Sequence, residues 1–259
     1  MVQQQQVAVV TGSATGIGRA IALDLAARTW SVVCIDLDAS GNDETASNAR
    51  LAGGDALAIT CDIADVDQVK QAFEVVARSF GRVNLLVNNA AVWEDTSLTA
   101  GGYDDQCAAF TRSIGSCSSG AFHCAAAAVP LMTDHGGDIV NLITEHIIEG
   151  RFITGYPASG YDCAKWSLWR LTETWAVELA PLGIRVNGFA FGATDTPMLR
   201  AVSVPLAEAG MRPGDLADAV QRVVALGPTG PSGRLYSFGF TRTPREVSLE
   251  QIAAISTSA

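Results

Sequence analysis

The sequence predicts an α/β fold in which one mostly parallel sheet of seven strands carries helices on both faces. The first observation is a set of seven short runs rich in Val, Ile and Leu, nearly continuous in apolar content, as strands covered on both faces should be. The second is that longer segments with helical spacing separate these runs, an alternation typical of parallel strands joined by helices. With 259 residues, 48% of them hydrophobic, the chain can bury a core of this size.

The elements follow from these runs in chain order. The expected strands cover residues 7–11, 32–36, 56–61, 84–88, 138–143, 185–189 and 234–238. The clearest helical patterns are Arg19–Arg28, directly after the first strand, Val66–Phe80 after the third, and Ala164–Leu179 before the sixth. Each expected helix therefore follows one strand and leads towards the next, as a parallel sheet requires.

No linker, repeat or low-complexity segment divides the chain. We therefore expect a single domain over residues 1–259, with a substrate-covering segment at about 190–215 and a polar C-terminal tail at about 241–259.

The composition limits the class of protein. A net charge of −10 disfavours a nucleic-acid or anionic-membrane partner, because an acidic surface supplies no attraction for either. No apolar run approaches the roughly 18 residues of a membrane span, and the N-terminus lacks a signal-peptide pattern, so we expect a cytoplasmic protein. The six cysteines and three histidines have no metal-ligand spacing, and we expect no metal site.

A glycine-rich turn follows the first expected strand. It reads TGSATGIG from Thr11 to Gly18. A strand before it and a helix after it aim backbone N–H groups and a helix N-terminus at one point, which favours a phosphate anion. An ordinary tight turn between a strand and a helix would have the same glycines. Asp36 ends the second strand eighteen residues after Gly18, about where an acidic group should meet the adenosine ribose hydroxyls and repel a 2′-phosphate, which favours NAD over NADP. A solvated aspartate at a strand end is the alternative.

A second pattern is YDCAK, Tyr161 to Lys165. Residues four apart lie on the same face of a helix, and a nearby ammonium lowers the pKa of a phenol, which suits acid–base catalysis. A Tyr/Lys pair is also common on solvated helix faces. Tyr156, the other tyrosine of this stretch, has no lysine four positions on.

These patterns occur in one order along the chain, together with Asp62 after the third strand and NNAA at 88–91 after the fourth. From about Val7 to Thr196 the chain resembles the short-chain dehydrogenase/reductase family. The resemblance implies a Rossmann-type, doubly wound fold and hydride transfer between a nicotinamide and a secondary alcohol or ketone, with Tyr161 as general acid/base. It also implies that Lys165 binds the nicotinamide ribose and lowers the tyrosine's pKa, and that Thr144 orients the substrate. The cofactor contacts that it implies are Gly12, Gly16, Ile17, Gly18, Asp36, Asp62, Ile63, Asn88, Ala90, Tyr161, Lys165 and Thr196.

The chain also departs from the family's pattern. Thr144 stands where a serine is usual, and the loop between Thr144 and Tyr161 is longer than we expect for the family. Cys117, followed by Ser118, takes the place of a helix asparagine that supports a proton relay, and a thiol is a weak hydrogen-bond partner. The relay is therefore expected to use a serine or water.

Three segments should line the substrate pocket: the residues after NNAA, the loop after Thr144, and the covering segment at about 190–215. The candidate substrate contacts that they supply are Trp93, Glu145, His146, Arg151, Tyr156 and Met198. The helix that bears Tyr161 is apolar over much of its circumference, so more than its own sheet should bury it. A covering loop could do so, whereas the resemblance implies a homodimer or homotetramer that packs through this helix.

The leading interpretation is an NAD-dependent alcohol dehydrogenase or ketone reductase. Two alternatives use the same cofactor site: an epimerase or dehydratase, which the short chain disfavours, and a dinucleotide-binding regulatory protein with weak or lost turnover, which the Thr144 and Cys117 changes would fit.

Overall fold

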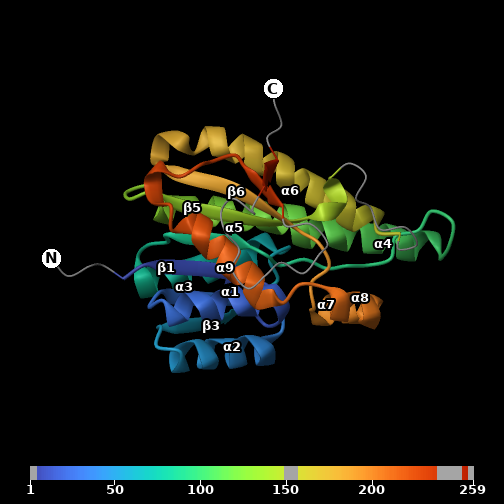
Figure 1. The fold of residues 1–259 in the computed structure, drawn as a ribbon, viewed down its shortest axis with the longest axis horizontal. Coiled ribbons are helices and arrows are strands. Elements are labelled where there is room, and N and C mark those ends of the chain that lie inside the picture. The colour runs from blue at the N-terminus through green and yellow to red at the C-terminus, as the bar shows by residue number, and fades with distance from the viewer. Residues whose placement is uncertain (1–4, 149–156, 238–252, 256–259) are drawn as a thin grey trace.

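The computed structural model describes residues 5–148, 157–237 and 253–255. Its eight-stranded sheet has the order β3-β2-β1-β4-β5-β6-β7-β8 (Figure 1). The strands are β1 Val7–Thr11, β2 Ser31–Asp36, β3 Ala56–Thr60, β4 Leu85–Asn88, β5 Gly137–Thr144, β6 Ile184–Phe191, β7 Leu235–Ser237 and β8 Ala253–Ile255. The first seven are parallel, which confirms the predicted sheet. The eighth pairs antiparallel with β7 and lies in the segment that we expected only as a polar tail.

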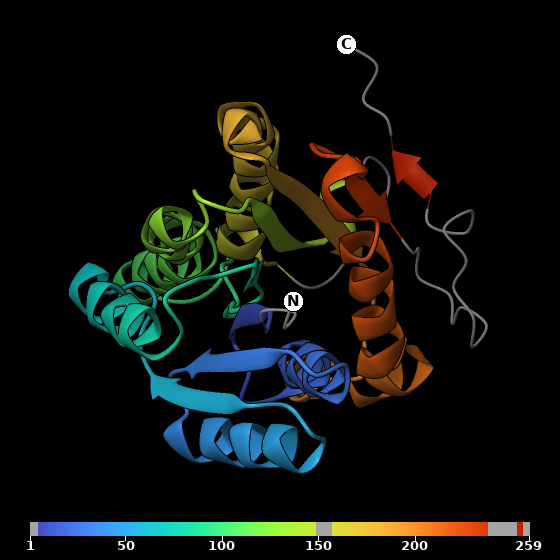
Figure 2. The ribbon, with the colours of Figure 1, turned by 90° about the vertical axis from the view of Figure 1, so that its left-hand side faces the viewer.

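Helices cover both faces of the sheet, as Figure 2 shows end-on. They are α1 Gly16–Ala27, α2 Ala39–Leu51, α3 Val66–Phe80, α4 Tyr103–Ile114, α5 Gly120–Ala128, α6 Ser159–Glu178, α7 Pro197–Val202, α8 Val204–Ala209 and α9 Pro213–Val224. Alternate strand residues enter different core clusters, because successive side chains of a strand point to opposite faces. Ala8 and Val10 pack with α1 and α9, whereas Val7 and Val9 pack with α3, α5 and α6.

The strand order places a crevice next to β1. The chain runs outward from β1 through β2 to β3, and then returns to β4 on the other side of β1. In open parallel sheets, ligands bind outside the carboxyl ends of the strands where the order reverses in this way. The turns after β1 and β4, which carry TGSATGIG and NNAA, therefore meet at one edge.

The boundaries of two helices decide how the site is built. α3 begins and ends as predicted, because Asp65 accepts hydrogen bonds from the backbone N–H groups of Asp67 and Gln68, and Gly81 ends the helix in the left-handed conformation. α6 begins at Ser159, five residues before the predicted start, so Tyr161 and Lys165 both lie within it.

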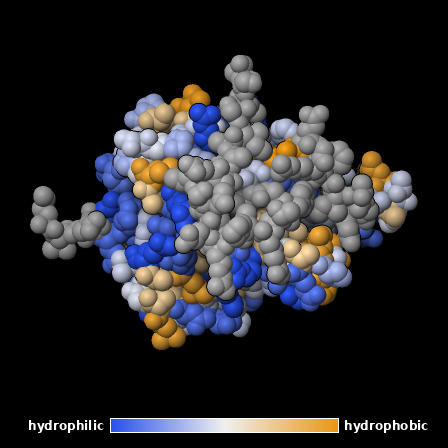
Figure 3. Space-filling model, in the orientation of Figure 1, coloured by the Kyte–Doolittle hydropathy of each residue, from blue (hydrophilic) through white to orange (hydrophobic). Residues whose placement is uncertain are grey.

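On the face that Figure 3 shows, the coloured surface is mostly hydrophilic, with apolar residues in small separate patches. Over α7 and α8, on the right of that view, apolar and hydrophilic residues are intermixed. No helix among the described residues is long and apolar enough to cross a membrane.

Candidate active site

A cleft of about 370 Å³ lies at the carboxyl ends of β1, β2, β4, β5 and β6. The strand ends supply its floor, and α6 and α7 supply two of its walls. Most of the predicted site residues line it: Gly12, Gly16, Ile17, Asp36, Asp62, Ile63, Ala90, Trp93, Thr144, His146, Tyr161, Lys165, Thr196 and Met198.

The glycine-rich turn brings its backbone close to the strand ends. Gly12 and Gly16 have φ values of +67° and +56°, which other residues adopt only with strain. A Cβ on Gly12 would lie 2.7 Å from Cα of Ala90, and one on Gly16 would lie 3.1 Å from the Thr196 methyl carbon. Gly18 has a different part. It does not line the cleft, and a Cβ there would lie 2.1 Å from the Gly12 carbonyl oxygen, so Gly18 lets α1 pack against the turn.

Asp36 is held in place from two sides. Its Oδ2 accepts a hydrogen bond from the backbone N–H of Ala14 at 2.8 Å, and its Oδ1 accepts one from the N–H of Asp38 at 3.0 Å. A carboxylate has about four lone-pair sites, so each oxygen retains acceptor capacity for a ribose hydroxyl. Together with the α1 N-terminus, this arrangement fits a dinucleotide that has its adenosine ribose at Asp36 and its pyrophosphate at Gly16 and Ile17.

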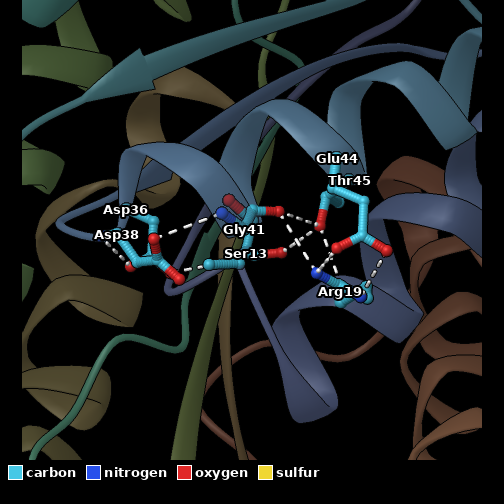
Figure 4. Close-up of polar contacts among 8 residues, drawn as sticks. Ser13, Arg19, Asp36, Asp38, Gly41, Glu44 and Thr45 are labelled. Atoms are coloured by element: carbon cyan, nitrogen blue, oxygen red, sulfur yellow. Dashed lines mark hydrogen bonds and ion pairs between the residues drawn. The ribbon is translucent and has the colours of Figure 1, made fainter.

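A second set of contacts fixes the turn from behind. Ser13 donates to Asn42 Oδ1 at 2.8 Å, and Thr45 donates to the Ser13 carbonyl oxygen at 2.9 Å. Arg19 donates to Thr45 and forms an ion pair with Glu44 at 3.1 Å. Figure 4 shows Asp36 and Asp38 on one side of Ser13 and Gly41, with Arg19, Glu44 and Thr45 on the other. The guanidinium of Arg19 is therefore engaged away from Asp36.

The end of β4 differs from the expected arrangement. Asn88 is buried and donates to Asn141 Oδ1 at 2.8 Å, so its side chain lies inside the fold and does not line the cleft. Asn89 lines the cleft instead, and its Nδ2 donates to the carbonyl oxygens of Thr11 and Gly12. The Thr11 hydroxyl accepts hydrogen bonds from the N–H groups of Asn89 and Ala90. The doubled asparagine of NNAA was the available signal, since adjacent residues of a strand point to opposite faces.

The structure brings Tyr161, Lys165 and Thr144 together. Thr144 is the last residue of β5, and its side chain lies close enough to the Tyr161 phenol to lower the pKa of the phenol as a hydrogen-bond partner. Lys165 lies one helical turn after Tyr161, and its Nζ is 5.5 Å from the centroid of the phenol ring. That Nζ donates to the carbonyl oxygen of Leu142 at 2.7 Å, which fixes the lysine against β5.

Burial dominates the electrostatics of this group. Burial raises the pKa of Tyr161 above its ordinary value, and Cys117 and Asp162 raise it further, while the hydrogen bond with Thr144 lowers it. Burial lowers the pKa of Lys165, which Cys117 partly offsets. We expected Lys165 to lower the tyrosine's pKa. In this structure the lowering contribution comes from Thr144.

The expected substitute for the relay asparagine lies in an unusual backbone segment. Cys117 belongs to a π-helical turn, Gly115–Ser119, between α4 and α5, and is buried. Such turns are frequent at functional sites. Ser118 accepts a hydrogen bond from Ser167 at 2.7 Å, whereas the cleft is lined by Ser116, which accepts a hydrogen bond from the backbone N–H of Val92. Ser116, which we did not predict, is therefore the serine of this turn that reaches the cleft.

The predicted substrate contacts separate into three groups. Trp93, His146 and Met198 line the cleft. Glu145 does not: it is fully buried and accepts a hydrogen bond from Ser237 on β7. Arg151 and Tyr156 lie outside the described residues. No cluster of three or more His, Cys, Asp or Glu side chains among the described residues could hold a metal ion.

Comparison with known proteins identifies the family. The family model described as short chain dehydrogenase matches residues 6–205. The chain therefore belongs to the short-chain dehydrogenase/reductase family of oxidoreductases, which bind nicotinamide cofactors and act on small molecules.

Three individual proteins illustrate the similarity. The chain is 37% identical to cis-4-hydroxycyclohexanecarboxylate dehydrogenase from Sinomonas cyclohexanicum over 196 residues, which cover 75% of this chain and 76% of that protein. It is 32% identical to the 3-oxoacyl-[acyl-carrier-protein] reductase FabG from Thermotoga maritima over 195 residues, 74% of this chain and 76% of the relative. A crystal structure of a short-chain type dehydrogenase/reductase from Mycobacterium marinum superposes with a TM-score of 0.81 at 26% identity, over 91% of this chain and 94% of that one.

Proposed function

We propose that the protein is an NAD-dependent oxidoreductase that moves a hydride between the nicotinamide and a cyclic secondary alcohol or its ketone. The observation that carries this proposal is the grouping of the Tyr161 phenol, the Thr144 hydroxyl and the Lys165 ammonium at one end of the cleft, with Asp36 at the other. The bound nicotinamide would supply the hydride acceptor or donor.

Each side chain has a separate part in this chemistry. Tyr161 would give a proton to the substrate oxygen during ketone reduction, or take it during alcohol oxidation. The Thr144 hydroxyl has one O–H donor and two acceptor lone pairs, so it can hydrogen-bond the same substrate oxygen and the Tyr161 phenol at once. Lys165, fixed by the Leu142 carbonyl, would place its ammonium beside the nicotinamide ribose and the phenol.

A cyclic substrate is favoured by the shape of the wall beside Tyr161. The Trp93 ring lies 4.9 Å from the Tyr161 ring, tilted by 55°. Flat rings of this kind pack well against another ring. A relative named as a hydroxycyclohexanecarboxylate dehydrogenase is in accord with this class, whereas a 3-oxoacyl thioester, suggested by the FabG name, is the competing substrate.

The first experiment is a fluorescence titration with NADH and NADPH, followed by a scan of NAD reduction against cyclic and open-chain secondary alcohols, with NADH oxidation by a 3-oxoacyl thioester alongside. We expect preferential NADH binding and turnover of a cyclic alcohol. Tight NADH binding without turnover of any compound would instead indicate a dinucleotide-binding regulatory protein. Turnover of the thioester alone would contradict the proposed substrate class.

Cofactor choice is tested at Asp36. Of the described residues that line the cleft, Lys165 alone carries a positive charge. It is held against β5, which lies three strand spacings, or about 14 Å, from β2, the strand that ends at Asp36. A 2′-phosphate at Asp36 would therefore meet a carboxylate without a compensating cation. Charge-assisted hydrogen bonds contribute about 1.5–3 kcal/mol, so Asp36→Ala should weaken NADH binding roughly tenfold or more. It should also bring the dissociation constants for NADH and NADPH closer together.

Two further variants separate charge from shape. Asp36→Asn keeps an acceptor for the Ala14 N–H but removes the charge, so it should reduce the preference for NADH over NADPH, chiefly by improving NADPH binding. Asp43→Asn, an exposed acid on α2, is the matched control and should leave this preference unchanged. An unchanged preference in both Asp36 variants would show that the ribose does not bind there.

We also propose that the chain forms a homodimer or homotetramer through α4 and α6. These helices pack side by side and leave Phe110 and Trp166 exposed by 40% and 55%. Light scattering should give about two or four times the 27.0 kDa chain mass, and Trp166→Glu should shift it towards the monomer. Leu51→Glu, at an exposed leucine of α2, should not. A monomer at every concentration would contradict this assembly.

A further inference from the structure

His146 lies beside Tyr161 and Thr144 but has no role in the chemistry proposed above. It follows Thr144 in a short 3-10 turn, Glu145–Ile147, and its side chain is only 9% exposed while still lining the cleft. The imidazole packs edge-on against Trp93, with ring centroids 5.7 Å apart, and lies 6.3 Å from the Tyr161 ring. The three rings therefore enclose the end of the cleft where the substrate oxygen would bind.

Asp162 fixes the orientation of this imidazole. His146 Nδ1 is 3.1 Å from Asp162 Oδ1, and Asp162 directly follows Tyr161 on α6. An ionised carboxylate only accepts hydrogen bonds, so Nδ1 must carry the proton. In the neutral ring, Nε2 is then an acceptor. The residue next to the catalytic tyrosine thus sets which nitrogen of His146 a ligand would meet.

The Nε2 atom is the free acceptor of this wall. Within residues 5–148 and 157–237, no hydrogen bond joins it to a protein group. A polar atom in a largely buried ring loses solvation unless a partner replaces it. Trp93 and Tyr161 contact this imidazole through their rings. A ligand group in the cleft is the natural partner.

Both chain neighbours of Trp93 are anchored to α4 or to the turn that follows it. The N–H of Val92 donates to Ser116 Oγ at 3.2 Å, and Glu94 forms a two-pronged ion pair with Arg112 at 2.7 and 2.5 Å. Trp93 therefore lies between two anchored residues of the chain. A wall that is held in this way discriminates between ligands better than a loose one, because its groups need no reordering on binding.

We propose that His146, positioned by Asp162, accepts a hydrogen bond from a second hydroxyl group of the substrate, so that the site prefers a cyclic diol or hydroxyketone to the corresponding molecule with a single oxygen. This inference rests on the proposed function, because it places the reacting oxygen at Tyr161 and Thr144 and the second hydroxyl a few bonds away, at His146.

A hydroxyl is a better partner here than a carboxylate. An anion would require the protonated ring, and the ion pair of that ring with Asp162 has no net positive charge left for a second acid. The formal charge of −10 gives no general attraction for anions either. A neutral Nε2 acceptor, by contrast, matches an O–H donor directly.

The test measures binding without turnover, using the complex of the enzyme with NADH, in which an alcohol cannot be oxidised. Titration calorimetry compares cyclohexanol, the 1,2-, 1,3- and 1,4-cyclohexanediols, and 4-hydroxycyclohexanecarboxylate. Steady-state kinetics with NAD then compares the same compounds. We expect at least one diol to bind about tenfold more tightly than cyclohexanol, equivalent to roughly 1.4 kcal/mol, with the kinetic difference mainly in KM.

The variants test the acceptor, His146, separately from the residue that orients it, Asp162. His146→Phe keeps a ring and removes the acceptor, and should reduce the diol preference to within about twofold. Asp162→Ala should reduce it as well, whereas Asp162→Asn should restore it, because its amide oxygen still accepts from Nδ1. His135→Phe, at a histidine in the turn before β5, is the matched control and should retain the full preference.

Several outcomes would overturn the inference: equal binding of diols and cyclohexanol, a preference that survives in His146→Phe, or tightest binding of the carboxylate. These results differ from a failure of the proposed function. If diol binding depends on His146 but no alcohol is oxidised, the reaction is wrong and the subsite stands. If alcohols are oxidised with no effect of His146, the reverse holds.

Discussion

Tyr161→Phe should reduce kcat/KM for the best alcohol by about 10²–10⁴-fold, the usual contribution of a positioned general acid or base. The phenylalanine ring keeps the contact with Trp93 and the hydrocarbon part of the pocket, and the Asp36 end of the cleft is unaffected. NADH binding should therefore stay within a few-fold of the wild-type value. Parallel fluorescence titration and steady-state kinetics check both parts.

The matched control is Tyr103→Phe. Tyr103 lies at the start of α4, 82% exposed and away from the cleft, so the same loss of a hydroxyl should leave kcat/KM unchanged. Normal activity in Tyr161→Phe would show that another group moves the proton, and would leave the grouping of Thr144, Tyr161 and Lys165 without its proposed purpose.

The surroundings of Tyr161 explain why this side chain needs help to act near neutral pH. Burial, Cys117 and Asp162 all raise its pKa, and Thr144 is the group in the structure that lowers it. The threonine thus has two connected parts: it can hold the substrate oxygen, and it stabilises the phenolate of its neighbour. The methyl group of Thr144 restricts its χ1 angle, which favours one fixed position for both contacts.

The sheet and most helices were predictable because their sequence signals are local. In α3 the acidic N-cap, the apolar periodicity and the terminal glycine all indicate the same helix, and its observed bounds are the predicted ones. The predicted α6 was too short because Ser159, Gly160 and Asp162 are not apolar. The first turn of the helix nevertheless packs closely against α4: a Cβ on Gly160 would lie 3.0 Å from Cα of Phe110 and 3.1 Å from Cβ of Ser113. Tertiary contact decided that boundary.

The strand β8 and two site residues show where a local signal is insufficient. β8 is a short edge strand of three residues, and its pairing with β7, as between Ser237 and Ala253, is a contact that a local pattern does not reveal. At the ends of β4 and β5, a shift of one residue changes the face on which a side chain lies. We placed Asn88 and Glu145 at the cleft, whereas their neighbours Asn89 and Thr144 line it; of these two, Thr144 was predicted and Asn89 was not.

Gly18→Ala should destabilise the fold and weaken NADH binding together, although alanine is the better helix former by about 1 kcal/mol. Its Cβ would lie 2.1 Å from the carbonyl oxygen of Gly12 and 2.5 Å from Asn89 Nδ2, and the first of these is backbone that moves only if the turn moves. Overpacking of this kind costs about 1–3 kcal/mol or more. Gly214→Ala is the matched control, since Gly214 lies at the start of another helix, α9, with open space around its Cβ position. Thermal unfolding and NADH titration of both variants check the result. A Gly18→Ala protein that gained stability and bound NADH normally would show that the close packing of α1 against the glycine-rich turn does not shape the cofactor site.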